Sequence, residues 1–205
     1  MKQINYKPKP KRCKQCDKEY MPYNPLQFLC SPNCYFEWSS EKEANKRVKQ
    51  MKKELLTTSD YCDILQKLVN QIARNIDTNY PCISSNRTTG QMHGGHMYSV
   101  GAHPELRFNL LNIWKQSAMD NTYKSGNIND YRANLEKNLG AYACYVFQLA
   151  ENAKPLKLSV YELQDKIKIA KQVIKEQANG DHVALGQEDR LTIRKYLNKR
   201  FGIYK

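Results

Sequence analysis

Apolar residues recur every three or four positions over much of the chain, a spacing that predicts mainly helical structure. Between residues 60 and 76 the pattern is regular enough to define one helix with a single buried face. Its apolar stripe comprises Leu65, Leu68, Ile72 and Ile76. Asn79, Tyr80 and Pro81 then interrupt the pattern, so we expect this helix to end before them.

A second apolar stripe begins at about Ile128 and predicts a further helical segment, with Asn127 as its N-cap. The stripe comprises Tyr131, Leu135, Leu139, Tyr142, Val146 and Leu149. Pro155 is expected to end this segment, because proline cannot continue a helix.

Two more helices are expected near the C-terminus. Ser159 and Glu162 have the spacing of a capping box, which predicts a helix start, and Asn179-Gly180 predicts its end. The apolar face between them comprises Leu163, Ile167, Ala170 and Ile174. A last helix is expected at about residues 187–200.

The N-terminal part of the chain has a different pattern. Residues 1–12 are rich in Lys and Pro and are interpreted as a disordered basic lead-in. Residues 32–56 have high helix propensity but few apolar residues after Trp38, so this helix is expected to face solvent or a phosphate backbone. Its candidate DNA contacts are Lys46, Arg47 and Lys49.

Residues 82–127 contain dispersed Gly, His, Asn and Ser and no long periodicity. We predict a β-hairpin there, followed by a loop and a short helix. The whole chain is therefore expected to be α+β and mainly helical.

Basic residues outnumber acidic ones by 33 to 20, a net charge of +13. The net charge is +6 over residues 1–60, +2 over residues 61–150 and +5 over residues 151–205. This distribution suggests a chemical centre between two arms that bind a polyanion, although a solvated basic surface would give the same totals. No apolar run is long enough for a membrane span, and no signal peptide is evident, so we expect a cytoplasmic protein.

Four of the seven cysteines are grouped near the N-terminus as CKQC and CSPNC. Two close cysteine pairs separated by a short loop suit four thiolates around one tetrahedral zinc ion. The predicted ligands are Cys13, Cys16, Cys30 and Cys34. Because all four positions come from the protein, such a zinc ion would be structural rather than catalytic.

Residues 93–127 contain His93 and His96, followed by Asn112 and Asn121. This order is similar to that of HNH (ββα-metal) nucleases, in which a hairpin histidine activates water. A following helix there presents a His or Asn that helps to hold one divalent cation. The residue types suit this chemistry, because neutral imidazole accepts a proton near pH 7 and an amide oxygen is a suitable ligand for magnesium.

A longer set of motifs resembles the NinG (Rap) family of lambda-type phage recombination proteins. The motifs are CxxC and CSPxC, CIS, GGHM, GAHPELRFN and KSGNINDYRANL, which cover roughly residues 10–150. Proteins of that family are regarded as structure-specific endonucleases that act on branched DNA, such as Holliday junctions and D-loops. The resemblance therefore implies this activity, in a bacterial host cell.

The resemblance also implies roles for individual residues. His96 would be the general base, and Asn112 would fix the hairpin through hydrogen bonds. His93 and Asn121 would be ligands of a catalytic Mg²⁺ or Mn²⁺ ion. His103 is interpreted as an ordinary surface or core residue, with a DNA contact as the alternative. The resemblance makes Arg107 a candidate phosphate contact. Lys124, close to Asn121 in the sequence, is a second candidate, with a solvated surface lysine as the alternative.

The chain departs from the family pattern at a second zinc site, which usually has two CxxC pairs. The four positions here are Cys82, Ser85, Ser117 and Asp120, so zinc is not expected there. Because the two histidines and Asn121 are retained, we expect an active finger without zinc. The residues expected to hold it by packing are Tyr98, Leu106, Phe108, Leu111 and Trp114.

The sequence therefore predicts an N-terminal zinc module and basic helix (13–58), an HNH-like nuclease core (59–150) and a C-terminal helical region (151–205). The expected partners are double-stranded and branched DNA, and an enzyme that cuts two strands would form a homodimer. Two alternatives remain open: a non-catalytic protein that binds branched DNA, and a zinc-dependent interaction module with no nucleic-acid role.

Overall fold

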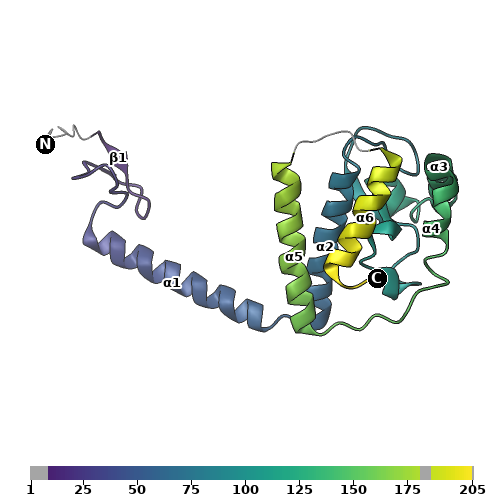
Figure 1. Cartoon of the computed structure of the whole chain (residues 1–205). Coiled ribbons are helices and arrows are strands. Elements are labelled where there is room, and N and C mark those ends of the chain that lie inside the picture. Colours follow the sequence, from purple (N-terminus) through teal and green to yellow (C-terminus); the bar gives the residue numbers. More distant parts are fainter. Residues whose placement is uncertain (1–8, 181–185, 205) are drawn as a thin grey trace, which may run out of the picture. The chain divides into compact units, whose positions relative to one another are not determined.

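The computed structural model of the protein describes residues 9–180 and 186–204 (Figure 1). The chain divides into two compact units, unit 1 up to Leu56 and unit 2 from Thr57 onward. The regions predicted as 59–150 and 151–205 therefore pack together within unit 2. As predicted, the described fold is mainly helical, and its strands form two separate two-stranded sheets.

Unit 1 is a short antiparallel hairpin followed by one long helix. Its elements are β1 (Lys11–Arg12), β2 (Glu19–Tyr20) and α1 (Pro32–Glu54). The core is small and consists of Cys13, Leu29 and Cys34, with Trp38 packed against it. Residues 1–8 of the predicted lead-in lie outside the described residues, whereas its last two residues form β1.

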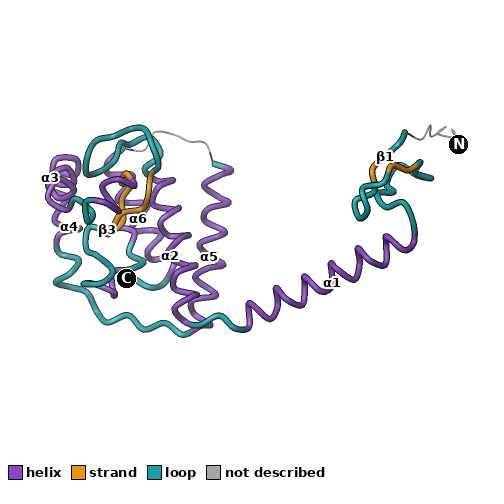
Figure 2. The backbone as a smooth tube through the Cα atoms, turned by 180° about the vertical axis from the view of Figure 1, so that it is seen from behind, coloured by secondary structure: helices purple, strands orange, loops and turns teal. Residues whose placement is uncertain are grey.

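Unit 2 begins with α2 (Thr58–Ile76), which starts at a capping box between Thr57 and Asp60. α5 (Val160–Asn179) starts at the capping box predicted between Ser159 and Glu162, which is confirmed. The two helices lie side by side in both views (Figures 1 and 2).

The two helices run in the same direction, as their side-chain contacts show. Tyr61 accepts a hydrogen bond from Gln164 near their N-termini, and Asn75 donates one to Gln177 near their C-termini.

A β-hairpin lies against α2, as the sequence predicted for residues 82–127. Its antiparallel strands are β3 (Met92–His96) and β4 (Ile113–Ser117), with His96 opposite Ile113. Gly94 is required there, because a Cβ on it would lie 2.8 Å from the Cβ of Asn70 on α2. The connection between the strands contains two 3-10 turns, η1 (Pro104–Leu106) and η2 (Leu110–Asn112).

The chain after β4 departs from the predicted single helical segment. The elements are a π-helical turn η3 (Met119–Tyr123), α3 (Ile128–Leu139), a 3-10 turn η4 (Gly140–Ala143) and α4 (Cys144–Phe147). The break occurs at Gly140, whose φ of +52° is a left-handed conformation that interrupts a helix. The apolar stripe continues on both sides of this glycine, so the sequence pattern did not reveal the break. Asn127 occupies the predicted N-cap position of α3, but its side chain does not cap the helix: its φ is +44°, and its amide donates to Asp120 and Asp130 instead.

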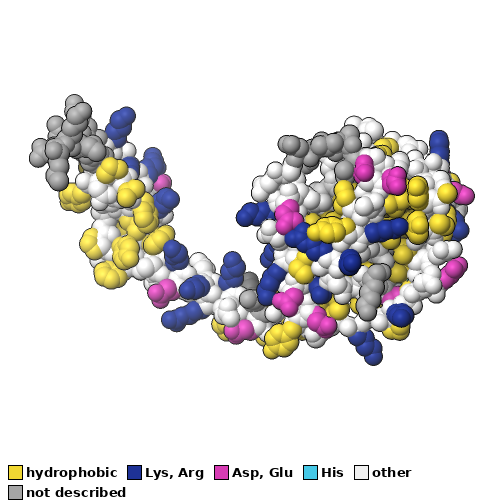
Figure 3. All heavy atoms as spheres, viewed as in Figure 1, with side chains coloured by type: hydrophobic (Ala, Val, Ile, Leu, Met, Phe, Trp, Pro, Cys, Tyr) yellow, Lys and Arg dark blue, Asp and Glu magenta, His cyan; other side chains and the backbone are white. Residues whose placement is uncertain are grey.

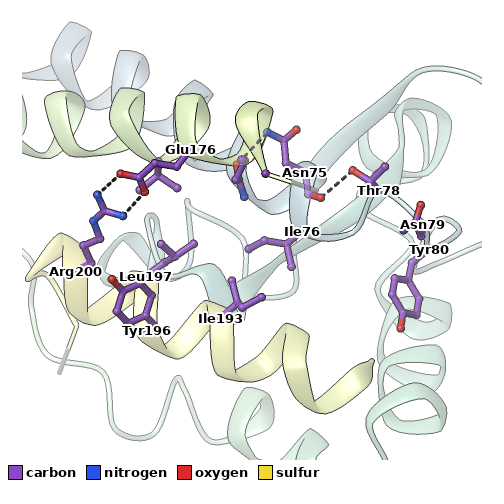
Figure 4. Close-up of a pocket in the computed structure, with 13 residues that line it drawn as sticks. Asn75, Ile76, Thr78, Asn79, Tyr80, Glu176, Ile193, Tyr196, Leu197 and Arg200 are labelled. Atoms are coloured by element: carbon purple, nitrogen blue, oxygen red, sulfur yellow. Dashed lines mark hydrogen bonds and ion pairs between the residues drawn. The ribbon is translucent and has the colours of Figure 1, made fainter. Parts of the chain in front are cut away.

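The last helix, α6 (Gln187–Phe201), matches the prediction and closes the fold against α5. Figure 4 shows the pocket where α2, α5 and α6 meet, with Glu176 and Arg200 facing each other. Two hydrogen bonds of 2.5 and 2.9 Å join this pair, so α5 and α6 are held together at the rim of the pocket.

The packing predicted for the hairpin is also observed. Leu106, Phe108, Leu111 and Trp114 are buried, and Tyr98 packs against the same core. The hydroxyl of Tyr131 on α3, which is fully buried, donates to the carbonyl of Gly95 at 3.0 Å. α3 is therefore attached directly to β3.

A charged cluster is buried beneath the hairpin. Asp77 follows α2 and pairs with two arginines of α6, at 3.1 Å from Arg190 Nε and 2.8 Å from Arg194 Nη2. The guanidinium of Arg194 lies 3.9 Å from the centre of the Trp114 ring. Asp77 also accepts the backbone N–H of Lys115 on β4, so a single carboxylate connects α2, α6 and the hairpin.

No helix in the described ranges is long and apolar enough to cross a lipid bilayer.

The buried cluster predicts a strong effect of Asp77→Ala. Removing the carboxylate leaves two arginine charges buried, and breaking buried pairs of this kind costs about 3–5 kcal/mol. The free energy of unfolding, measured by urea denaturation, should fall by that amount. Asp165→Ala is the control, because Asp165 is exposed in its pair with Lys168 and its loss should cost roughly 0.5 kcal/mol or less. Equal effects of the two substitutions would contradict the role assigned to Asp77.

Candidate metal centre and active site

The four N-terminal cysteines converge on one point in unit 1. Cys13 and Cys16 lie between β1 and β2, whereas Cys30 precedes α1 and Cys34 lies in its first turn. The four Sγ atoms all lie within 4.8 Å of one another. Cys30 Sγ is 3.6 Å from Cys16 Sγ and 3.5 Å from Cys34 Sγ.

This geometry fits a zinc ion. Four thiolates at a Zn–S distance of about 2.3 Å in a tetrahedron lie roughly 3.8 Å apart, close to the separations observed. Cys13 Sγ also accepts the backbone N–H of Cys30 at 3.4 Å. Burial raises the pKa of Cys13, but backbone N–H groups of Cys16, Cys30 and Gln15 lower it to about 6, which favours the thiolate. Within residues 9–180 and 186–204, no other group of three or more His, Cys, Asp or Glu side chains converges in this way.

The second candidate site lies at the hairpin of unit 2. His93 and His96 are on β3, and Asn121 is in the π-helical turn after β4. The amide nitrogen of Asn121 lies 3.2 Å from His93 Nδ1. The structure thus brings together the two residues predicted to hold a catalytic ion, from positions 28 residues apart.

His96 is held by its own hydrogen bond at the end of β3. Its Nε2 lies 3.0 Å from the carbonyl oxygen of Arg107. Because a carbonyl oxygen can only accept, Nε2 carries the proton in the neutral ring, and Nδ1 is left as the basic nitrogen. Burial lowers the pKa of His96, the hydrogen bond to the Arg107 carbonyl opposes this, and the charge of Arg107 lowers it again; the net shift is downward and favours the neutral ring at pH 7.

Asn112 makes the contacts that a hairpin-fixing role requires. It is fully buried, its Oδ1 accepts the backbone N–H of Tyr98 at 2.8 Å, and its Nδ2 donates to the Tyr98 carbonyl at 2.9 Å. Since Tyr98 follows His96 by two residues, these bonds fix the direction in which the chain leaves β3.

A cavity of about 510 Å³ opens beside these residues and is lined by His96, Asn121 and His103. The sequence interpretation took His103 as an ordinary surface or core residue, with a DNA contact as the alternative. Its Nδ1 lies 3.0 Å from Glu105, and its ring packs edge-on against Tyr98. The His-Pro-Glu spacing was the available signal for this pair, but the sequence could not show that His103 lines the same cavity as His96.

The candidate phosphate contacts lie in different surroundings. Arg107 forms an ion pair of 2.6 Å with Asp63 on α2, and Lys124 lies 3.2 Å from Asp120. The basic residues predicted on α1 are exposed and belong to unit 1: Lys46, Arg47 and Lys49.

The four positions of the degenerate zinc site form a hydrogen-bonded cluster around the carboxylate of Asp120. Asp120 is 1% exposed, and its Oδ2 accepts from Ser85 Oγ at 2.5 Å and from Ser117 Oγ at 2.6 Å. Cys82 Sγ lies 3.5 Å from the same oxygen and accepts the backbone N–H of Ser117. Lys124 pairs with Oδ1, so the buried charge is compensated.

Burial alone would raise the pKa of Asp120. Hydrogen bonds from Ser117 and Ser85, together with Lys124, instead hold it well below its usual range. The side chain is therefore an ionised acceptor, and Asn121 follows it directly in the chain.

The family model described as the bacteriophage lambda NinG protein matches residues 5–180. The chain belongs to the NinG family. It is 32% identical over 161 residues to the protein ninG of Escherichia phage lambda, which covers 67% of this chain and 79% of that protein. It is 31% identical over 157 residues to the protein ninG of Salmonella phage P22, covering 65% and 77%. No solved structure matches the chain.

The NinG match spans the cysteine cluster, the hairpin site and the cluster around Asp120. The match ends before α6, although Arg190 and Arg194 of that helix pair with Asp77 in the buried cluster next to the hairpin.

The cysteine geometry predicts one zinc ion per chain of this NinG-family protein, measured by elemental analysis after extensive dialysis. Cys16→Ser should lower the zinc content sharply, since it removes one of four ligands. Cys144→Ser is the matched control, because Cys144 is also exposed but lies on α4 in unit 2. Full zinc content in Cys16→Ser, or loss of zinc in Cys144→Ser, would refute the site.

The cluster around Asp120 predicts a pH-dependent loss of stability in Asp120→Asn. At pH 7 the cost should be about 2–4 kcal/mol, because a buried, hydrogen-bonded carboxylate is lost. The folded pKa is depressed, so this stabilisation is complete above the unfolded value of about 4 and is lost as pH falls towards the folded value.

The difference in unfolding free energy between wild type and Asp120→Asn should therefore shrink below about pH 4. Asp130→Asn is the control: Asp130 is exposed and accepts from the same Asn127. A difference that stays constant down to pH 2 would exclude the ionised carboxylate as its source.

Proposed function

We propose that this NinG-family protein is a metal-dependent, HNH-like endonuclease that acts in phage recombination in the cytoplasm of the bacterial host. Its substrates would be branched DNA molecules such as Holliday junctions and D-loops. The observation that carries the proposal is that a neutral, tethered His96 lines the same cavity as Asn121, which contacts His93.

His96 is suited to remove a proton from the attacking water. Its hydrogen bond to the Arg107 carbonyl fixes the ring and leaves Nδ1 as the acceptor. Asn112 supports this arrangement indirectly, because it fixes the backbone that follows His96. The backbone carbonyl of Arg107 would position His96, and its guanidinium, now paired with Asp63, would have to exchange that partner to contact a phosphate.

The donor set suits a weakly held divalent ion. His93 offers an imidazole nitrogen and Asn121 an amide oxygen, which would replace the hydrogen bond that now joins them. A bound Mg²⁺ or Mn²⁺ supplies positive charge against the scissile phosphate. With no carboxylate in this pair, most of its coordination would come from water and from DNA phosphate, so ion affinity should depend on bound DNA.

DNA binding is proposed to involve both units. Lys124 borders the candidate site, and three exposed basic residues project from α1: Lys46, Arg47 and Lys49. A homodimer would allow two strands of a junction to be cut.

The alternative is a non-catalytic accessory protein that binds branched DNA. The absence of a carboxylate from the His93–Asn121 pair is the observation that favours it. The two proposals predict the same binding and differ in cleavage, so one experiment separates them.

The experiment is cleavage of a labelled four-way DNA junction with Mg²⁺ or Mn²⁺. The wild type should cut, and His96→Ala should cut at least about 100-fold more slowly, because it lacks the general base. Junction binding by His96→Ala should be unchanged in a gel-shift assay. Asn152→Ala, at an exposed position near Pro155, is the control and should cut like the wild type.

Tight, salt-sensitive junction binding with no cutting in either metal would establish the accessory alternative. Equal cutting by wild type and His96→Ala would mean that a different group is the base.

A further inference from the structure

Unit 1 carries a set of aromatic side chains on its surface, which we call the aromatic patch: Phe28, Tyr35, Phe36 and Trp38. Hydrophobic side chains gather on this unit in Figure 3. Phe36 is 68% exposed and Tyr35 is 54% exposed. A unit this small would be expected to bury such large rings, because they are the main source of hydrophobic stabilisation. Their exposure therefore points to a ligand.

The rings of the aromatic patch are in contact with one another. Phe28 and Trp38 meet edge to face with centroids 5.2 Å apart, and Tyr35 and Phe36 do so at 6.2 Å. Tyr35 joins the two pairs, with its centroid 6.5 Å from that of Trp38. The patch is thus one continuous aromatic surface rather than scattered residues.

Lysines are interleaved with these rings. Lys14 Nζ lies 5.6 Å from the centroid of Phe28, and Lys42 Nζ lies 4.7 Å from that of Trp38. The cations continue along α1, because Lys42 is followed by Lys46 and Lys49 at intervals of four and three residues. These intervals keep the three lysines on the helix face that carries Trp38.

The combination of rings and lysines identifies the class of partner. The core of a protein–protein interface is enriched in aromatic residues but depleted in lysine, so the interleaved cations argue against a protein. Duplex DNA offers phosphates, but its bases are stacked on one another and their faces are inaccessible from outside. Unpaired bases expose their faces to aromatic rings, and their phosphates attract the lysines.

We propose that the aromatic patch, with Lys14, Lys42, Lys46 and Lys49, binds single-stranded DNA. Unpaired bases stack on the rings, and the strand continues along the lysines of α1. This inference extends the proposed function by assigning to unit 1 the unpaired strand of a branched substrate. It can still be tested separately, because stacking requires no cleavage.

Trp38 supplies the readout. The chain has two tryptophans: Trp114 is 1% exposed in unit 2, whereas Trp38 is half-buried in unit 1 and contacts the rings of Phe28 and Tyr35, so Trp38 is the one that reports binding at the patch. Titration of the full-length zinc-loaded protein with a thymidine oligonucleotide of about 15 nucleotides should quench tryptophan fluorescence. A duplex of the same length should need at least roughly tenfold higher concentration for the same quenching.

Substitutions in the aromatic patch should weaken this binding selectively. Tyr35→Ala and Phe36→Ala should each raise the Kd for the labelled oligonucleotide at least about fivefold in an anisotropy assay, as loss of one stacking ring does. Tyr161→Ala is the matched control: Tyr161 is 81% exposed but lies on α5 in unit 2, and its substitution should change nothing. Retained zinc content will show that the variants are folded.

Lysine substitutions test the path of the strand. Lys42→Gln and Lys46→Gln should each lower the slope of log Kd against log salt by about 0.7, the value for one phosphate contact of a single strand. Lys168→Gln on α5, an exposed lysine of unit 2, should leave the slope unchanged.

Three results would overturn the proposal. One is equal affinity for duplex and single strand, and another is an unchanged Kd in both aromatic variants. The third is self-association that Phe36→Ala abolishes in sedimentation velocity, since the patch would then join two copies of the chain. Single-strand binding without junction cleavage would leave this inference intact and defeat only the proposed endonuclease activity.

Discussion

The carboxylate of Asp77 is the contact on which the architecture of unit 2 depends. It lies at the end of α2, pairs with Arg190 and Arg194 of α6, and accepts the backbone N–H of Lys115 on β4. Two buried arginines exceed one carboxylate in charge. The excess is accommodated by the Trp114 ring and by backbone carbonyls of Leu110 and Ile113, which accept from Arg194. Displacing α6 would therefore expose the buried charged cluster that supports the hairpin carrying His96.

The cluster around Asp120 shows a second way to hold an irregular segment. A tetrahedral metal site fixes a turn by joining four ligands to one cation. Here one anion, Asp120, plays the central part, and Ser85, Ser117 and Lys124 surround it as donors. The charges are reversed relative to a metal site, with an anion in place of the cation. The geometric effect is similar, because Asp120 attaches the turn that follows β4 to the segment before β3. Asn121 emerges directly from this fixed point.

The sequence predicted those elements whose determinants are local. Amphipathic spacing predicted α2, amphipathic spacing with a capping box predicted α5, and the spacing of the four cysteines predicted their convergence on one point. The predicted helix boundary was wrong where a single backbone conformation decides the outcome, as at Gly140. The apolar stripe continues past this glycine and therefore suggested an unbroken helix. The sequence also could not place Arg190 and Arg194 in the core, since arginines are normally exposed and their partner lies more than 100 residues away. The contact between His93 and Asn121 was suggested only by a resemblance.

The two units differ in the chemistry that they present. Unit 1 offers exposed rings and lysines beside a four-cysteine cluster that fits zinc, whereas unit 2 offers a cavity beside His96 and Asn121. A short connection between the end of α1 at Glu54 and the start of α2 at Thr58 joins them along the chain. Under the proposed function, a strand bound by unit 1 would remain tethered to unit 2 through this connection. Under the proposed function, weakening unit 1 would raise KM and leave kcat largely unchanged, because the group that takes the proton belongs to unit 2 alone.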